Sequence, residues 1–392
     1  MFPRLVWLAL GTFAVGTESF VVAPLLPAIA GDLGVPIVAA GWLVTVFALF
    51  YAFGAPVLTV ALASVERKRL LVGALGAFVI ANLFAAMAQS FTQLLLARAA
   101  LALVAGLYMA SANAVATAMV EPHQRGRAIA IVVGGSAAAT ALGVPIGSFL
   151  GNTADWRMTF MMIAAFAAVG VVGLAFGLKR DLPRSVSTLS ERLAVGRRSD
   201  ILHGLMVTFL FAVGLSVVFT YLAPLLTRAA GFDAGMISAA LLVWGLSAAA
   251  GNALGGIAAD RVGSEWTLRL GLLTLAAAFG LIGFAATVLG PASAGPVMIA
   301  AVGFWGAAGW AVFAAQMTHL ARLAPQVAVV TLSLNASIFY AGIATGSAVG
   351  SFAVAFGGLT NLGWIAAALQ LAALATFLFG RRKVSPAATE AA

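Results

Sequence analysis

The stretch Ala23-Pro24-Leu25-Leu26 recurs as Ala223-Pro224-Leu225-Leu226, and Gly147-Ser148-Phe149 recurs as Gly350-Ser351-Phe352. Weaker matches keep the same order and a similar spacing. They pair Gly54 with Gly251, Pro122 with Pro325, and Gly143 with Gly346. An ordered series of matches at a nearly constant offset indicates that two halves of the chain follow one structural plan.

The composition is typical of a protein embedded in a lipid bilayer. Of the 392 residues, 63% are hydrophobic and 8% are charged, whereas a soluble domain carries about 25% charged residues. The chain is therefore an integral membrane protein. It has no cysteine, and its three histidines lack metal-ligand spacing, so we expect no metal site and no cofactor other than a proton. We explain the net charge of +9 by retention of Lys and Arg on one membrane side, and we expect no nucleic-acid partner.

The pattern predicts an all-α membrane protein of twelve transmembrane helices in two pseudo-symmetric six-helix bundles. A spanning helix needs about 20 apolar residues. We place the spans near 5–29, 39–61, 70–90, 93–118, 128–151, 158–178, 202–227, 236–259, 267–289, 294–318, 328–351 and 358–380. The domains are then an N-terminal bundle (1–178), a cytoplasmic linker (179–201), a C-terminal bundle (202–380) and a cytoplasmic tail (381–392).

The orientation follows from the basic residues. Almost all of the 21 Lys and Arg residues fall in loops on one side of the predicted spans, in the linker or at the termini. Arg157 and Arg228 lie on the other side, and Arg98 lies within a span. Since basic loops stay in the cytoplasm, both termini are predicted to be cytoplasmic. Six spans per half make the two repeats parallel in topology.

Several local motifs resemble one transporter family. The loop after the eighth span reads Gly256-Ile257-Ala258-Ala259-Asp260-Arg261-Val262-Gly263, and the fifth span carries Gly143-Val144-Pro145-Ile146-Gly147. With twelve spans and Arg98 in the fourth, this resembles the major facilitator superfamily, whose loop signature is G-x-x-x-D-R-x-G. The Gly/Pro-rich fifth span resembles that of its drug–proton antiporters. The first span, with Gly16-Thr17-Glu18-Ser19-Phe20 leading to Leu25-Leu26-Pro27-Ala28-Ile29-Ala30, is similar to the branch that includes arabinose-like sugar exporters and chloramphenicol exporters.

The resemblance implies a proton-coupled antiporter that exports small amphipathic molecules, including drugs, by alternating access. It further implies a monomer in the bacterial cytoplasmic (inner) membrane, with a small-molecule substrate and the lipid bilayer as partners. An exporter of sugars, nucleosides or other metabolites is the alternative, and a non-transporting membrane sensor is a distant one. We do not expect an enzyme, because the spans lack the convergent polar groups that a catalytic site needs.

Glu18 is the one acidic residue that we place deep inside a span, roughly 20 Å along a helix starting at residue 5. An ionised group there costs at least about 2.5–3.5 kcal/mol, so it needs a cavity, a proton or a partner. We expect Glu18 to be the proton-coupling site or the counter-charge of a cationic substrate. The alternative is a structural carboxyl that hydrogen-bonds another helix.

Arg98 is the one basic residue inside a span, at a depth comparable to that of Glu18. An arginine near Glu18 would favour the ionised carboxylate, and protonation of the carboxylate would release the arginine for another partner. We therefore assign Glu18 and Arg98 together to proton coupling. The alternative for Arg98 is a side chain that snorkels to the outer interface.

The loop signature predicts a gate at the cytoplasmic side. A carboxylate at the end of the eighth span can accept hydrogen bonds from a helix N-terminus, and the resemblance makes that partner the start of the fifth span. The alternative is a solvated loop pair. We interpret the first-half counterpart, residues 63–69, as lacking the acidic residue and the glycine of the signature. The gating residues are Gly256, Asp260, Arg261, Gly263, Arg125 and Arg127.

Two further sets complete the prediction. Glycines and a proline in the fifth and eleventh spans permit close helix contact and bending; they are Gly134, Gly143, Pro145, Gly147, Gly346 and Gly350. Sparse polar or flexible side chains are available to a substrate cavity, although each could instead bond a neighbouring helix. They are Tyr51, Met109, Asn113, Gln316, Asn335 and Tyr340. We expect the tryptophans and the 26 phenylalanines to lie mostly at lipid or interface positions.

Overall fold

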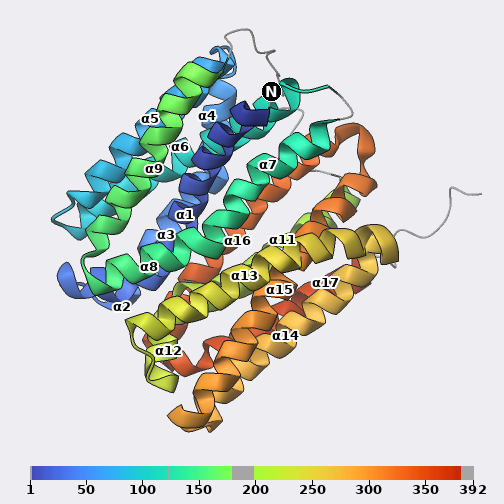
Figure 1. Cartoon of the computed structure of the whole chain (residues 1–392). Coiled ribbons are helices and arrows are strands. Elements are labelled where there is room, and N and C mark those ends of the chain that lie inside the picture. Colours follow the sequence, from blue (N-terminus) through green and yellow to red (C-terminus); the bar gives the residue numbers. More distant parts are fainter. Residues whose placement is uncertain (1, 122–123, 179–197, 381–392) are drawn as a thin grey trace, which may run out of the picture.

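The computed structural model describes residues 2–121, 124–178 and 198–380, and the regular secondary structure in these ranges is helical (Figure 1). The predicted tail and almost all of the predicted linker lie outside the described residues. The helix that follows the linker begins at Ser199.

The first half forms six spans, of which the second and fifth are built from several segments. The second span consists of α2, α3, η1 and α4, and the fifth consists of α7, η3 and α8. The elements are α1 (Phe2–Asp32), α2 (Ile37–Ala40), α3 (Trp42–Leu49), η1 (Phe50–Gly54), α4 (Ala55–Ala61), α5 (Arg67–Ala86), α6 (Phe91–Ala118), α7 (Arg125–Ala138), η3 (Ala139–Gly143), α8 (Val144–Thr153) and α9 (Trp156–Gly177).

The second half repeats this order with a seventh span broken at Tyr221. The elements are α11 (Ser199–Thr220), α12 (Leu222–Ala230), α13 (Ala234–Ala258), η4 (Ala259–Gly263), α14 (Ser264–Val288), α15 (Pro291–Leu323), η5 (Pro325–Val327), α16 (Ala328–Gly357), η6 (Leu359–Asn361) and α17 (Leu362–Gly380). Observed and predicted spans agree within a few residues.

The predicted twelve-span, all-helical fold is confirmed. Within the described ranges, eleven stretches are long and apolar enough to cross a membrane, and one of them, Ala234–Val288, has 55 residues. A helix of that length would extend about 80 Å, far beyond a hydrocarbon core of about 30 Å. The chain turns back at Gly263, whose φ of 96° suits glycine, so this stretch is two spans.

The two halves lie side by side, blue to green and yellow to red in Figure 1. We call the end of the bundle with Arg67, Arg261 and Arg322 the Arg-rich end, which the basic loops predict to be cytoplasmic. Contacts between the halves gather toward the opposite end: α2, α3 and η1 pack on α16, η3 and α8 on α13, and α1 on α12. Toward the Arg-rich end, α4 packs on α6, and α7 packs mainly on α1 and α6. The halves are thus joined at the opposite end and part toward the Arg-rich end.

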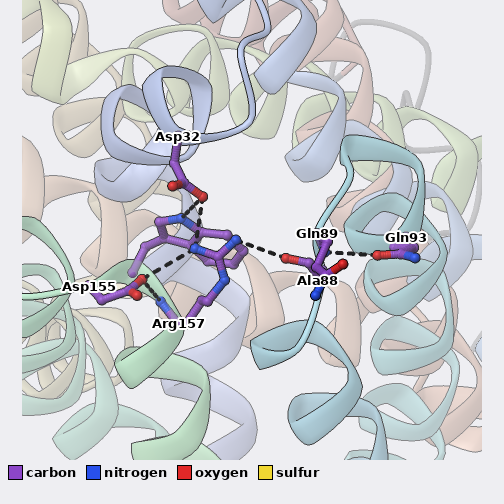
Figure 2. A network of polar contacts seen from close by, with 7 residues as sticks. Asp32, Ala88, Gln89, Gln93, Asp155 and Arg157 are labelled. Atoms are coloured by element: carbon purple, nitrogen blue, oxygen red, sulfur yellow. Dashed lines mark hydrogen bonds and ion pairs between the residues drawn. The ribbon is translucent and has the colours of Figure 1, made fainter.

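A polar network fastens the first half at the opposite end (Figure 2). Arg157 Nη1 donates to Asp32 Oδ2 at 2.8 Å, and Arg157 Nη2 donates to the carbonyl of Ala88 at 2.9 Å. Trp156 Nε1 donates to the same Asp32 oxygen at 3.1 Å. Asp155 caps α9 by accepting from the backbone N–H of Arg157. One arginine therefore links the end of α1, the loop after α5 and the start of α9.

We predict that Arg157→Ala lowers the Tm of the purified protein by about 2–5 °C. A partly exposed ion pair contributes up to about 1 kcal/mol, the bond to Ala88 adds about 1 kcal/mol, and these energies correspond to a few degrees. The control is Arg228→Ala, which removes an exposed arginine near the end of α12. Equal melting curves for the two variants would contradict a fastening role.

Candidate functional site

An ion pair is buried between α1 and α6. The side chains of Glu18 and Arg98 are 0% and 1% exposed, and Arg98 Nη1 donates to Glu18 Oε1. Arg98 Nε also donates to the carbonyl of Leu43 at 3.2 Å, and the guanidinium lies 4.1 Å from the ring centroid of Phe47. The two charges that the sequence singled out therefore meet, and Arg98 is held inside the protein rather than at the interface.

One oxygen of this pair lacks a partner. Glu18 Oε2 is buried without a hydrogen bond, although buried polar atoms in folded proteins are almost always bonded. A carboxylate in such surroundings is neutralised either by its arginine or by a proton. The geometry thus provides a proton acceptor beside a cation that holds other contacts.

Two tyrosines connect this region across the halves. Tyr51 of η1 and Tyr340 of α16 stack at 3.6 Å between ring centroids with 18° between their planes. The Tyr340 hydroxyl also interacts with Ser19 and lies within electrostatic reach of Arg98. Both predicted cavity tyrosines therefore lie at the contact between the halves, close to the ion pair.

An aromatic pocket lies between the halves beside α1. We use this name for the cavity lined by Ser19, Phe20, Ala23, Val44, Phe211, Leu215, Ser216, Phe219, Trp244, Trp305, Gly309, Trp310, Phe313, Phe339 and Ile343. Four of these residues come from α1 and α3, and the rest belong to the second half. None of the six predicted cavity residues lines it.

Two of those six form a polar network inside the second half. Thr208 Oγ1 donates to Asn335 Oδ1 at 2.6 Å, and Gln316 Nε2 donates to Thr208 Oγ1 at 3.0 Å and to the carbonyl of Gly204 at 2.7 Å. These bonds join α11, α15 and α16. Both amides are thus engaged in contacts between helices, the alternative that the sequence had left open.

The other two lie on α6. Asn113 Nδ2 donates to the carbonyl of Met109, one turn away, at 3.3 Å. Met109 packs against the core of the first half. Asn113 Oδ1 is buried without a partner. Their assignment to a cavity stays a prediction.

The opposite end is closed by a close approach at Gly41. Ser347 Oγ of α16 donates to the carbonyl of Gly41 at 3.1 Å, and Tyr221 Oη lies 2.6 Å from Ser351 Oγ. A Cβ at Gly41 would overlap Tyr221 Oη and approach Ser351 Oγ. The absence of a side chain at Gly41 therefore lets the second span meet the seventh and eleventh.

The predicted gating residues lie at the Arg-rich end. Asp260 and Arg261 belong to the π-helical turn η4, which Gly263 ends. Asp260 Oδ1 accepts from Arg322 Nη2 at 3.4 Å, and both side chains are exposed. A Cβ at Gly256 would meet open space. Arg127 is exposed at the start of α7, and the side chain of Arg125 lies outside the described residues.

The expectation that the first-half counterpart of this loop lacks the acidic residue is wrong. Glu66 stands where the signature has Asp260, and its Oε2 lies 3.0 Å from Arg69 Nε. The pair spans three residues of the same helix start, so it stays within the first half.

The predicted hinge residues differ in their surroundings. Gly143 lies against Thr17, Gly147 against Val21, Gly346 against Val213, and Gly350 against Val217 and Tyr221. Gly134 has open space around it. The close contact between α7 and α1 is instead at its neighbour Gly135, which lies against Ala9. Pro145 is the second residue of α8, just after the π-helical turn η3, and its missing N–H permits a widened turn there.

The sequence interpretation missed the aromatic pocket. We expected tryptophans at lipid or interface positions, and Trp266 fits with 65% exposure, but Trp244 and Trp305 are buried in the pocket wall. A clustering of Trp244, Trp305 and Trp310 in two spans of one half was the available signal. Since each span is apolar on all sides, periodicity could not tell their inward face from the lipid face.

Comparisons with known proteins give one consistent family. Residues 8–203 match the model of the Major Facilitator Superfamily. The chain is 31% identical over 372 residues to an uncharacterised transporter of this type from Bacillus subtilis, covering 95% of this chain and 94% of the relative. It is 34% identical over 262 residues to a chloramphenicol resistance protein from Streptomyces lividans, covering 65% and 66%.

A solved structure has the same fold. It is a bacterial homologue of the human lysosomal transporter Spinster, in an inward-facing and occupied conformation. The TM-score is 0.75, the two chains share 19% sequence identity, and 98% of each is covered.

We predict that Gly41→Val opens the opposite end. Overpacking costs about 1–3 kcal/mol, enough to shift the conformational equilibrium roughly tenfold or more. A membrane-impermeant maleimide added on the membrane side of the opposite end should then label Ala23→Cys about tenfold faster. The chain has no cysteine of its own, so labelling reports this position alone. The control is Gly31→Val, since Gly31 has open space around it. Unchanged labelling in the Gly41 variant would rule out this closure.

Proposed function

The chain belongs to the Major Facilitator Superfamily, and we propose that it is a proton-coupled antiporter that exports small amphipathic molecules, including drugs, by alternating access. As a member of this family it is a multi-pass membrane transporter with a small-molecule substrate, and the expectation that it is not an enzyme is confirmed. The coupling ion, the direction of transport and the substrate class are the proposal.

The observation that carries the proposal is the buried pair of Glu18 and Arg98 with its unpartnered carboxylate oxygen. A proton on Glu18 neutralises one member of the pair. Leaving the other charge buried without compensation costs about 3–5 kcal/mol, which corresponds to a shift of more than 100-fold between two conformations. Binding of one proton is therefore sufficient to favour a different conformation.

Arg98 links protonation of Glu18 to the contact between the two halves. Besides Glu18, Arg98 contacts the carbonyl of Leu43 and the ring of Phe47, and neither contact needs the charge of Glu18. Tyr340, within its electrostatic reach, stacks on Tyr51 across the boundary between the halves. A shift of the guanidinium toward Tyr340 would change the contact that must open when the opposite end opens.

The orientation of this state fits export. The Arg-rich end is predicted to face the cytoplasm of a bacterial inner membrane, so the halves part toward the side from which an export substrate enters. The proton would reach Glu18 when the opposite end is open. A sugar or nucleoside exporter is disfavoured because few hydrogen-bonding side chains line the aromatic pocket.

We predict that Glu18→Gln abolishes proton-driven accumulation of substrate in proteoliposomes, because the amide does not titrate. Exchange of substrate between two equal pools should persist, since a neutral side chain resembles the protonated state. The control is Asp233→Asn, which replaces an exposed carboxylate that caps α13 by another good capping residue. Uphill transport by the Glu18 variant would disprove proton coupling at this residue.

We further propose that Asp260 latches the Arg-rich end in its closed state by accepting from the start of α7. A charge-assisted hydrogen bond contributes about 1.5–3 kcal/mol, so Asp260→Asn should favour the state open at the Arg-rich end about tenfold, measured by labelling of single cysteines from that side. Arg322→Gln, which removes the partner that Asp260 has here, serves as the comparison and should not favour that state. Equal effects of both variants would argue against the latch.

A further inference from the structure

The walls of the aromatic pocket consist of packed aromatic side chains, which suit a flat aromatic ligand. Phe219 and Trp244 lie 4.9 Å apart between ring centroids, Trp244 and Trp305 lie 6.0 Å apart, and Phe20 meets Phe219 edge-on at 5.7 Å. The first two pairs are tilted and the third is edge-to-face, all at spacings favourable for aromatic pairs. A planar aromatic molecule in the cavity, against the free faces of these side chains, would extend the same packing.

Among the polar groups of the lining, the indole N–H of Trp244 is buried without an acceptor. Ser19 Oγ donates to the carbonyl of Val15 at 2.9 Å, and Ser216 Oγ donates to the carbonyl of Ile343 at 2.8 Å. Trp244 Nε1 is buried and has no acceptor, and among the buried unpartnered side-chain atoms of the described residues it is the one that belongs to the pocket lining. An oxygen acceptor on a bound molecule would satisfy it.

No charged residue lines the pocket. The nearby carboxylate of Glu18 is already paired with Arg98. A charged molecule would lose its hydration on entering and find no opposite charge in the wall. Although aromatic rings attract cations, the gain is small compared with full desolvation of a cation. The lining therefore favours an uncharged ligand.

From these observations we propose that the aromatic pocket is the substrate site and that it selects an uncharged, planar aromatic molecule whose oxygen accepts a hydrogen bond from Trp244 Nε1. This inference rests on the proposed export function for its biological meaning, but binding can be measured without transport. It also fixes the charge balance: export of a neutral molecule against one proton moves one net charge.

The test uses the purified full-length protein and two matched probes. One is 6-propionyl-2-(dimethylamino)naphthalene, an uncharged planar ketone, and the other is 2-(dimethylamino)naphthalene, which lacks the carbonyl. Binding is followed by tryptophan-sensitised naphthalene emission. Trp244→Phe keeps a ring and removes the N–H, so the Kd of the ketone should rise about fivefold while that of the carbonyl-free probe stays the same. Phe219→Ala should weaken both probes at least tenfold.

The control is Trp266→Phe, which changes an exposed tryptophan and should leave both Kd values unchanged. The proposal is overturned if Trp244→Phe affects both probes equally or neither. It is also overturned if ethidium, a planar cation, or 8-anilinonaphthalene-1-sulfonate, an anion, binds more tightly than the ketone. Uphill transport by the Glu18 variant would refute the coupling proposal and leave these binding results standing.

Discussion

A carboxylate and a guanidinium, both removed from water, make up the interaction on which the rest of this structure depends. Neither Glu18 nor Arg98 could remain charged in its position alone, because an isolated charge in a low-dielectric interior costs several kcal/mol. The pair holds α1 to α6, and the bond from Arg98 to Leu43 adds the second span. Three of the six spans of the first half are thereby positioned by one charge pair. The second span also packs on α16, so the charge pair helps to position the two halves relative to each other.

The two halves share a scaffold and differ in what they bury. Close contacts recur at matching positions, as at Gly143 against α1 and Gly346 against α11. The first half buries the ion pair, whereas the second half buries an amide and hydroxyl network around Thr208 and contributes most rings of the aromatic pocket. This division favours a protein in which one half binds the proton and the other binds most of the substrate.

Sequence reasoning reached the fold and singled out the two residues of the ion pair for physical reasons. Span length and basic loops follow from the bilayer itself, and an acid and a base in apolar spans are so costly that each demands a partner. It did not reach the aromatic pocket. Trp244 and Trp305 sit in spans that are apolar on every side, so no period in the sequence separates a wall of the pocket from a lipid-facing surface. Gln316 and Asn335 drew attention because polar residues are rare in spans, yet helix packing alone gives them partners.

The first span lies where these features meet, and its geometry explains why coupling needs no long path. Glu18 and Phe20 are two residues apart, so on a helix their side chains point about 200° from each other. One faces Arg98, and the other lies among Phe219, Trp244 and Trp310 of the opposite half. Any rotation or shift of α1 that follows the loss of the ion pair must therefore move Phe20 against the rings of the pocket. Since packed aromatic side chains tolerate little displacement, the proton and a molecule in the pocket would compete through a single rigid helix.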